Sequence, residues 1–469
     1  MKINPTIFRE YDIRGIAGKD LTEDFARLLG LGFAAYLEKN QKPNGSRFKV
    51  SLGWDCRLSS QGYADALTKG LSEGGVDVVR LGTCPTPLTY FSLFHLNTDG
   101  GIMITGSHNP SDYNGFKICI GRDTIYGKRI QELRQVIEQN PQGAPQHGKV
   151  TEYAIIPPYI EKLLEIAKPV KNKRIVLDSG NGTASIVAPE LFSKLGADVV
   201  PLYCDMDGRF PNHHPDPTVT TNLKDLIETV KKVKADFGLA FDGDADRIGL
   251  VDENGRIVYG DEIMVMFSRD ILKETPGATI ISEVKSSHRL YNDIAANGGK
   301  PIMWKTGHSL IKSKMKETKA ALAGEMSGHM FFADRYYGYD DAIYAALRVY
   351  EIASNYPKGI SEYISDLPQT VSTPEIRIDC EEDKKFALVE EIKKRLSSGR
   401  SITDIDGVRV DFGDGWGLVR ASNTQPVLVL RFEATSNQRL KDIRNTIEGA
   451  LFEAAKAVGH GPLKESSDH

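Results

Sequence analysis

Cysteine is scarce in this chain, and the few cysteines form no recognisable pattern. The 469 residues include five cysteines, an odd number, and no two of them stand in a CxxC pair. They are Cys56, Cys84, Cys119, Cys204 and Cys380. The odd number argues against a disulfide framework, and the lack of a CxxC pair argues against a zinc knuckle. A reducing cytoplasm is the location that we expect.

Long apolar runs and an excess of one charge are also missing. No stretch of about 18 apolar residues occurs, so the sequence predicts no transmembrane helix and no membrane partner. The first fifteen residues are interrupted by charged side chains, and we expect no signal peptide. Lys and Arg number 59 and Asp and Glu number 63, which gives a formal charge of −4. Proteins that mainly bind nucleic acid are usually basic, so we expect no nucleic-acid partner.

Length and pattern together predict several α/β domains. At roughly 150 residues per domain, this length predicts about three. Three segments repeat the order strand, polar loop, helix, glycine and second strand, and they cover Phe48–Gly82, Arg174–Tyr203 and Ala278–Lys305. This order is the βαβ unit, which requires a mostly parallel sheet covered by helices. The sequence therefore predicts three related α/β domains.

The remainder of the chain has a different pattern. After Gln369 come a strand candidate, a helical segment at Asp383–Ser397, strands separated by glycine turns, and an amphipathic helix at Asn437–Val458. We predict three α/β domains with mixed, mostly parallel sheets and a smaller C-terminal α+β domain. The predicted domains cover residues 1–150, 151–255, 256–368 and 369–469.

The first loop with chemical potential is TGSHNP, Thr105–Pro110, which follows the strand candidate GGIMI. A serine hydroxyl at Ser107 sits beside a glycine, in a loop that can approach a ligand closely. Its position at a strand end suits a nucleophile or a phosphate carrier. Lys117 follows ten residues later, and the chain could bring its ammonium group back to the same site. A surface turn rich in small residues is the alternative interpretation.

The second loop is FDGDADRIGL, which spaces three carboxylates at Asp242, Asp244 and Asp246. In a coiled loop this spacing can aim three hard oxygen ligands at one point, as Mg²⁺ requires. Arg247 follows directly and could meet a phosphate at the metal. A solvated acidic turn is the alternative.

The third loop is GEMSGH, where Glu325 and Ser327 stand between glycines. A carboxylate accepts hydrogen bonds from hydroxyl groups and a serine both donates and accepts, so the pair could bind neighbouring sugar hydroxyls. A glycine-bounded turn would explain the same residues without a ligand.

The fourth loop is RASNTQP, between two strand candidates. A phosphate dianion accepts from guanidinium, hydroxyl, amide and backbone N–H groups together, and this loop offers all of them. The candidate phosphate ligands are Arg420, Ser422, Asn423 and Thr424. A polar hairpin turn is the alternative.

These four loops in this order, with YDIRG near the start, resemble the α-D-phosphohexomutase family and within it the bacterial phosphomannomutase/phosphoglucomutase branch. The resemblance covers nearly the whole chain, with one motif in each predicted domain. It implies four domains around a central active-site cleft. It also implies that Ser107 carries a phosphoryl group, and that Asp242, Asp244 and Asp246 hold one Mg²⁺ together with an oxygen on Ser107.

The resemblance extends to residues outside the four strongest matches. Lys117 and His308, the latter in KTGHS, match positions that transfer protons. Arg14 and Arg247 match catalytic positions near the reacting phosphate and the metal. The implied substrate-binding residues are Tyr11, Lys285, Glu325, Ser327, His329, Arg420, Ser422, Asn423 and Thr424.

The implied activity interconverts mannose 6-phosphate with mannose 1-phosphate, and glucose 6-phosphate with glucose 1-phosphate. It proceeds through phosphoserine and a 1,6-bisphosphate sugar, so glucose 1,6-bisphosphate or an equivalent is the expected activator. The expected partners are hexose phosphates, and we expect a monomer, with a dimer as the alternative.

Three other functions compete with this one. Phosphoglucosamine mutase belongs to the same family, but that branch typically has Gln where this chain has Met326. A metal-dependent sugar phosphatase could use Ser107 as a transient carrier, yet it would not need the phosphate ligands of the fourth loop. A sugar-phosphate sensor would not need a phosphoryl acceptor at all.

Overall fold

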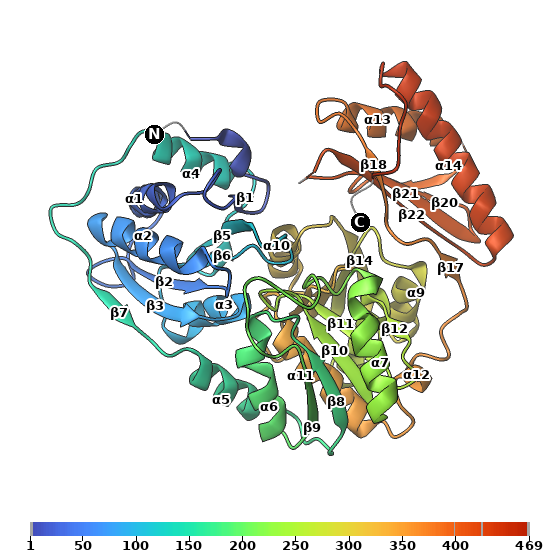
Figure 1. The fold of residues 1–469 in the computed structure, drawn as a ribbon. Helices are drawn as coiled ribbons and strands as arrows, with labels where there is room; N and C mark the ends of the chain where they lie inside the picture. The colour runs from blue at the N-terminus through green and yellow to red at the C-terminus, as the bar shows by residue number, and fades with distance from the viewer. Residues whose placement is uncertain (1–2, 398, 424, 467–469) are drawn as a thin grey trace.

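Four sheets, each with its own helices, divide the chain into four domains (Figure 1). The computed structural model describes residues 3–397, 399–423 and 425–466. Within these ranges, no helix is long and apolar enough to cross a membrane. The limits of the domains, as inferred from the sequence, stay a prediction.

The first domain is built around a seven-stranded sheet. Its elements are η1 (Pro5–Ile7), β1 (Ile13–Ile16), α1 (Glu23–Asn40), β2 (Lys49–Trp54), α2 (Ser60–Glu73), β3 (Asp77–Thr83), α3 (Thr86–His95), β4 (Gly100–Ile104), β5 (Tyr113–Ile120), β6 (Asp123–Thr124), α4 (Lys128–Glu138) and β7 (Val150–Glu152). The strand order is β1-β5-β4-β2-β3-β7, with β6 against β5. Strands β4, β2, β3 and β7 are parallel, and β5 runs antiparallel to β4.

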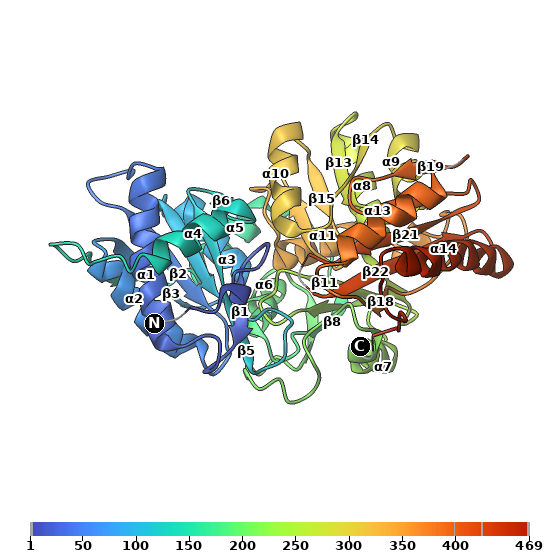
Figure 2. The ribbon, with the colours of Figure 1, turned by 90° about the horizontal axis from the view of Figure 1, so that it is seen from above.

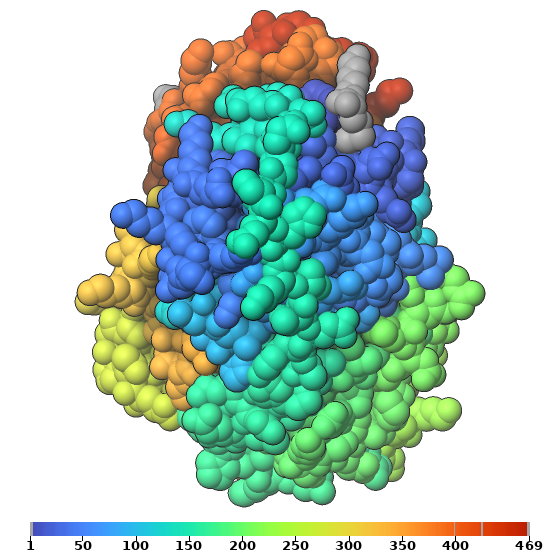
Figure 3. All heavy atoms as spheres, turned by 90° about the vertical axis from the view of Figure 1, so that its left-hand side faces the viewer, coloured from blue at the N-terminus to red at the C-terminus, as the bar shows by residue number. Residues whose placement is uncertain are grey.

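The first predicted βαβ unit is therefore confirmed as β2–α2–β3. The segment after α4 crosses the outer face of this domain, as the teal chain in Figure 3 shows. There Ala144 and Gly148 donate their backbone N–H groups to the carbonyls of Glu73 and Ser72 at the end of α2. These bonds satisfy backbone groups that a helix end leaves unpaired.

The second domain has a five-stranded sheet. Its elements are α5 (Ile156–Ile166), β8 (Arg174–Asp178), η2 (Thr183–Ile186), α6 (Ala188–Lys194), β9 (Asp198–Leu202), η3 (Thr220–Leu223), α7 (Lys224–Val233), β10 (Phe237–Phe241), β11 (Ile248–Asp252) and β12 (Ile257–Val258). The order is β12-β11-β10-β8-β9. Strands β10, β8 and β9 are parallel, and β10 and β11 form an antiparallel hairpin whose connection is the acidic loop.

The third domain has a four-stranded sheet in the order β14-β13-β15-β16. Its elements are α8 (Gly260–Glu274), β13 (Thr279–Glu283), α9 (His288–Ala296), β14 (Lys300–Trp304), α10 (His308–Thr318), β15 (Leu322–Gly324), β16 (Met330–Phe332), α11 (Ala342–Asn355) and α12 (Ile360–Tyr363). Only the pair β15–β16 is antiparallel among the described strands of this sheet, and GEMSGH connects these two strands.

The fourth domain confirms the predicted change of fold. Its elements are β17 (Val371–Ser372), β18 (Ile376–Asp379), α13 (Lys385–Leu396), β19 (Ser401–Thr403), β20 (Val408–Asp411), β21 (Gly415–Ala421), β22 (Val427–Ala434) and α14 (Asn437–Ala457). The described strands pair antiparallel throughout, and α13 and α14 lie together on one side of the sheet (Figure 2).

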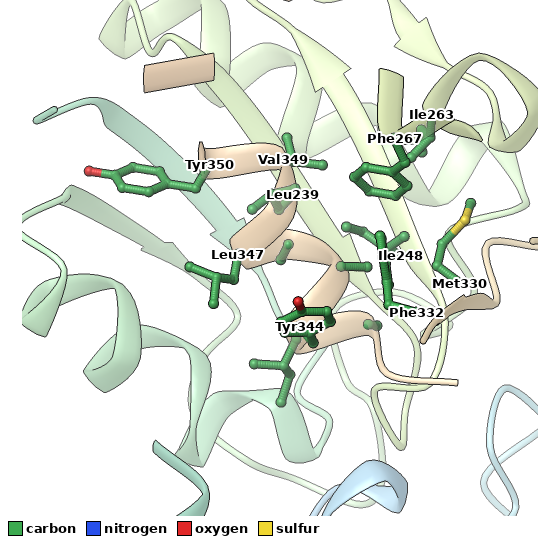
Figure 4. Close-up of a cluster of buried hydrophobic side chains, with 14 of the residues drawn as sticks. Leu239, Ile248, Ile263, Phe267, Met330, Phe332, Tyr344, Leu347, Val349 and Tyr350 are labelled. Carbon is green, nitrogen blue, oxygen red and sulfur yellow. The ribbon is translucent and has the colours of Figure 1, made fainter. Parts of the chain in front are cut away.

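The largest hydrophobic core joins the second and third domains. Every residue of α11 from Ala342 to Ser354 is buried, as expected for a helix that is apolar on most sides. Figure 4 shows Val349 of this helix beside Leu239 of β10, and Tyr344 on the side of Phe332 of β16. Residues of α3 belong to the same core, so the first domain is anchored to the other two.

Phe332 is the core position at which we expect a single truncation to be most informative. Its ring lies 4.8 Å from that of Phe267 and 5.2 Å from that of Tyr344, and only 1% of the residue is exposed. Phe332→Ala should lower the free energy of unfolding by about 3–5 kcal/mol, because it leaves a cavity in a packed core. Phe452→Ala is the control, since Phe452 is 50% exposed. Equal thermal midpoints for the two variants would contradict this account of the core.

Candidate active site

Ser107 lies in the loop that follows β4, in a backbone conformation that is unusual for serine. Its φ is +49°, in the left-handed region. Its Oγ donates a hydrogen bond to Asp242 Oδ2 at 2.8 Å and lies 3.1 Å from Nδ1 of His108. The hydroxyl is thus directed at the acidic loop of the second domain, and the residue is almost fully buried.

Arg57, which the sequence analysis missed, holds this loop in place. Its guanidinium donates to the carbonyl oxygens of Ser107 at 2.8 Å and Asn109 at 2.6 Å, and also to those of Pro110 and Tyr113. Buried carbonyl oxygens need donors, and one guanidinium supplies several. Asp55 pairs with Arg57 at 3.2 Å and accepts from the backbone N–H of Gly106 at 3.1 Å. The motif WDCR after β2 was the available signal.

The acidic loop brings its three carboxylates together, as the spacing predicted. One oxygen from each of Asp242, Asp244 and Asp246 lies within 4.8 Å of the others, and all three residues are buried. Lys117 of β5 donates to Asp244 Oδ2 at 2.8 Å and also to Asp246 Oδ2. Burial lowers the pKa of this ammonium, but the two carboxylates outweigh that effect and the pKa is raised.

This loop has the properties of a site for a hard divalent cation. Asp244 Oδ1 is buried and has no hydrogen-bond partner among the described residues. Burial and the carboxylates of Asp244 and Asp246 raise the pKa of Asp242 well above its usual range. A divalent cation would relieve both costs, and a set of three carboxylates suits Mg²⁺. The residues present therefore fit the predicted metal.

The acidic loop can approach Ser107 this closely because Gly243 has no side chain. A Cβ at this position would lie 2.6 Å from the carbonyl oxygen of Ser107, which is too short for any real contact. Glycine is therefore required where the two loops cross.

His329 connects the acidic loop to the third domain. Its Nε2 lies 3.1 Å from Asp246 Oδ1, and its Nδ1 lies 2.8 Å from Glu325 Oε2. Burial lowers the pKa of this imidazole, but the two carboxylates raise it overall, to about 9. Asp246, His329 and Asp340 are also close enough to be a metal site. An imidazolium between two carboxylates explains the position of His329 better, because both ring nitrogens already face anions.

Glu325 and Ser327 differ in their surroundings. Glu325 accepts a hydrogen bond from the backbone N–H of Gly307 at 2.6 Å, in addition to its contact with His329. Ser327 is half-buried in the turn between β15 and β16. The loop thus presents one firmly held carboxylate and one accessible hydroxyl group.

Tyr11 and His308 meet at the start of α10. Their rings are 5.7 Å apart, and the Tyr11 hydroxyl donates to the carbonyl oxygen of Thr306 at 3.1 Å. Gly307 has a φ of +130°, and a Cβ there would lie 2.5 Å from the Tyr11 hydroxyl, so only glycine fits. Burial and the cations Lys312, His329 and Lys117 lower the pKa of His308.

The fourth loop is joined to this cluster by direct contacts. Asn423 donates to the Tyr11 hydroxyl at 3.0 Å, across the first and fourth domains. Arg420 pairs with Asp406 at 3.1 Å, and the Ser422 hydroxyl accepts from the backbone N–H of Gln425 at 3.2 Å. Thr424 lies outside the residues that the structure describes.

Three further cations of the predicted site are held by neighbouring side chains. Lys285 lies 3.0 Å from Glu375 of the fourth domain and 3.5 Å from Glu283. Arg14 donates to Asn109 of the serine loop at 2.6 Å and to Asp12 at 2.5 Å. Arg247 lies 3.3 Å from His329, through Nε and Nε2. Residues from all four domains are thus linked by hydrogen bonds or ion pairs.

Comparison with known families gives four consecutive matches. The matching family models are described as phosphoglucomutase/phosphomannomutase, alpha/beta/alpha domain I at residues 5–143, domain II at 157–255, domain III at 259–371, and the C-terminal domain at 375–450.

Comparison with individual proteins gives similar chains of nearly the same length. A phosphomannomutase/phosphoglucomutase of Pseudomonas aeruginosa is 47% identical over 447 residues, which cover 95% of each chain. A phosphoglucomutase of Neisseria meningitidis is 44% identical and covers 95% of this chain and 96% of its own length. A crystal structure of a phosphoglucomutase/phosphomannomutase family protein from Burkholderia thailandensis has a TM-score of 0.90 and 41% identity, covering 98% of this chain and 100% of its own.

Arg57→Lys tests whether the guanidinium holds the serine loop. Lysine keeps the charge but supplies a single donor centre, so most of the four carbonyl contacts should be lost. We expect backbone amides at 105–113 to exchange hydrogen at least about 10-fold faster. Arg209→Lys is the control, because the Arg209 side chain is 72% exposed and pairs with Asp207, and it should leave these amides unchanged. Unaltered exchange in both variants would remove Arg57 from this role.

The raised pKa of His329 predicts a pH dependence of stability. The imidazolium is paired only in the folded protein, and an unfolded histidine has a pKa of about 6.5. Its contribution is therefore fully present below about pH 6.5 and is lost as pH rises through about 9. In EDTA, the wild type should have a higher thermal midpoint than His329→Gln below about pH 6.5. This difference should become smaller as pH rises towards about 9. An advantage that grows with pH would contradict the ionic pairing.

Proposed function

The chain belongs to the phosphoglucomutase/phosphomannomutase family, and we propose that it interconverts the 1-phosphates and 6-phosphates of mannose and glucose. It is an intramolecular phosphotransferase, as the enzymes of this family are. The observation that carries the proposal is the hydrogen bond from Ser107 to Asp242, beside the ion pairs of Lys117 with Asp244 and Asp246. The proposed phosphoryl carrier, the proposed metal loop and the ammonium group of Lys117 would then act together on one phosphoryl group.

In the first half of the proposed reaction, phosphoserine 107 phosphorylates the sugar. The free sugar hydroxyl bonds to phosphorus while the bond from phosphorus to Ser107 Oγ breaks. His308 takes the proton of the sugar hydroxyl, and Lys117 gives a proton to Ser107 Oγ. The product is a 1,6-bisphosphate sugar. The lowered pKa of His308 suits a proton acceptor, since its imidazole is neutral at physiological pH.

In the second half, the bisphosphate turns end over end and the proton transfers reverse. Ser107 Oγ attacks the other phosphate and returns its proton to Lys117. His308 then protonates the sugar oxygen that leaves. The protons and phosphoryl groups balance over the cycle, so only the position of the phosphate on the sugar has changed.

Mg²⁺ fits the acidic loop, with Asp242, Asp244, Asp246 and an oxygen on Ser107 as its proposed ligands. The family is metal-dependent, and we propose one Mg²⁺ per chain. When bound, Mg²⁺ stabilises the negative charge that spreads over the transferred phosphoryl group. Lys117 already pairs with Asp244 and Asp246, and we propose that Arg14 and Arg247 add positive charge at the reacting phosphate.

The phosphate that does not react is proposed to bind the fourth loop. Arg420, Ser422 and Asn423 offer guanidinium, hydroxyl and amide groups, and Thr424 would add a second hydroxyl. This group of residues can accept either end of the bisphosphate, which explains how one Ser107 serves both positions. Closure of the fourth domain over the sugar would exclude water, which otherwise hydrolyses phosphoserine.

The third loop is proposed to select the sugar. Glu325 and Ser327 would bind neighbouring hydroxyls of the ring, with His329 beside them and Lys285 and Tyr11 around the substrate. Relatives at 44–47% identity are named for mannose and glucose phosphates. We therefore propose hexose phosphates as substrates and glucose 1,6-bisphosphate, or an equivalent, as activator.

Ser107→Ala tests the phosphoryl carrier. With glucose 1,6-bisphosphate and Mg²⁺ present, the wild type should convert mannose 1-phosphate and glucose 1-phosphate to the 6-phosphates, and glucosamine 1-phosphate more slowly. Ser107→Ala should lose at least about 10⁴-fold in kcat, because the acceptor oxygen is gone. Thr105→Ser, in the same loop, is the control for loop damage. Near-normal turnover by Ser107→Ala would assign the carrier to another residue, and rapid release of inorganic phosphate by the wild type would favour a phosphatase.

Asp244→Asn tests the metal loop by binding alone. The variant should bind Mg²⁺ at least about 10-fold more weakly in calorimetric titration, because a charged ligand becomes neutral. Asp225→Asn, in α7 of the same domain, is the matched control and should bind as the wild type does. Equal affinities in all three proteins would place the metal elsewhere.

A further inference from the structure

Asp340 carries a buried carboxylate oxygen for which no described residue supplies a hydrogen bond. The residue lies between β16 and α11, and none of its surface is exposed. Its Oδ1 accepts from Lys312 Nζ at 2.8 Å, whereas Oδ2 is buried without a hydrogen-bond partner in the part of the chain that the structure describes. Burial of a carboxylate oxygen without a hydrogen-bond partner costs free energy, so the orientation of this carboxylate needs an explanation.

Two side chains of α10 face this carboxylate. His308 and Lys312 are four residues apart on one side of the helix, which brings both to the same neighbour. Lys312 occupies Oδ1, and Nδ1 of His308 lies 3.7 Å from Oδ2. The Ser309 hydroxyl lies 3.5 Å from the same Nδ1, and it can accept or donate a hydrogen bond. The oxygen without a partner is therefore the one that faces the histidine.

The other ring nitrogen of His308 has a different environment. Among the described residues, Nε2 of His308 has no hydrogen-bond partner, and the ring stands 5.7 Å from that of Tyr11 and 5.6 Å from that of His329. Because Nδ1 is directed at Asp340, Nε2 is directed away from it. The ring thus has one nitrogen beside a fixed anion and one available to a ligand.

We propose that Asp340 is a positioning residue that fixes the orientation and tautomer of His308. The carboxylate accepts a hydrogen bond from Nδ1–H and leaves the lone pair of Nε2 to take the proton of the sugar hydroxyl. In the second half of the reaction, Nε2–H returns that proton to the leaving sugar oxygen. This inference rests on the proposed function, in which His308 exchanges a proton with the sugar.

Two physical considerations support this arrangement. A neutral imidazole has one N–H, and the hydrogen bond made by one nitrogen decides which nitrogen carries it. A nearby carboxylate therefore selects Nδ1–H, as it does in other pairs of histidine and aspartate. The distance of 3.7 Å is longer than a hydrogen bond, which is about 2.7–3.2 Å, and such contacts often shorten when substrate binds.

The tautomer of His308 can be measured without any assay of activity. In protein labelled with ¹⁵N-histidine, two-dimensional spectra distinguish the two tautomers, and His308→Asn identifies the signals by their loss. We expect the Nδ1–H form in the wild type and a shift towards Nε2–H in Asp340→Asn, because the new amide can donate to Nδ1. An Nε2–H form in the wild type would overturn the proposal.

A double-mutant cycle gives the kinetic test. Asp340→Asn should lower kcat about 10–100-fold with KM within about 2-fold, since the substrate contacts stay in place. In the background of His308→Asn, the same change should cost less than about 3-fold, because Asp340 acts through the histidine. Equal losses in both backgrounds would mean that Asp340 serves only the structure.

The controls separate local unfolding from loss of positioning. Asp341→Asn changes the next carboxylate, which caps α11 and accepts from Tyr159, and it should alter the thermal midpoint without altering the tautomer of His308. If Asp340→Asn does not fold, the double variant Asp340→Asn/Lys312→Met takes its place in the cycle, because it removes both charges of the buried ion pair. If the wild type does not convert hexose phosphates, the proposed function is wrong. The tautomer measurement would still show whether Asp340 fixes the orientation of His308.

Discussion

Three carboxylates on one short loop repel one another, and the ion pairs of Lys117 with Asp244 and Asp246 offset that repulsion. These pairs cross from the first domain to the second and are fully buried. A buried charge is tolerated only when it is paired. Separation of the two domains would therefore leave Lys117, Asp244 and Asp246 exposed or unpaired. Lys117 therefore fixes both the acidic loop and the position of the first domain. Asp244 Oδ1, still unpartnered among the described residues, leaves capacity for a divalent cation.

Further contacts extend from these two ion pairs towards the fourth domain. Asp246 holds His329, His329 holds Glu325, and Glu325 accepts from the backbone at the start of α10. From there, Tyr11 and Asn423 reach the fourth domain. The chain of contacts runs from the proposed metal loop to the proposed phosphate ligands. Residues separated by hundreds of positions in the sequence are thus held close together. The proposed reaction requires this, because it takes place at both ends of one sugar.

Much of this organisation follows from the sequence. The three βαβ units and the change of fold in the last part of the chain are confirmed, as is the family that the four loops indicated. Strand ends followed by polar loops carry that information locally. Arg57 was not predicted, because it acts through backbone carbonyl oxygens of a distant loop, and the motif WDCR alone does not show which carbonyl oxygens the guanidinium reaches. The same holds for Asp340, whose partners His308 and Lys312 come from another element. The roles of the site residues stay predictions.

The central claim is that one serine passes a phosphoryl group to the sugar and takes it back. The most direct test is mass spectrometry of the Ser107 peptide in a single turnover. Protein is first incubated with glucose 1,6-bisphosphate and Mg²⁺, separated from the excess, and mixed with mannose 1-phosphate. We predict that phosphate is present on Ser107 before mixing and is afterwards recovered as sugar bisphosphate. Phosphate that never enters Ser107, or that leaves it only as inorganic phosphate, would contradict the account.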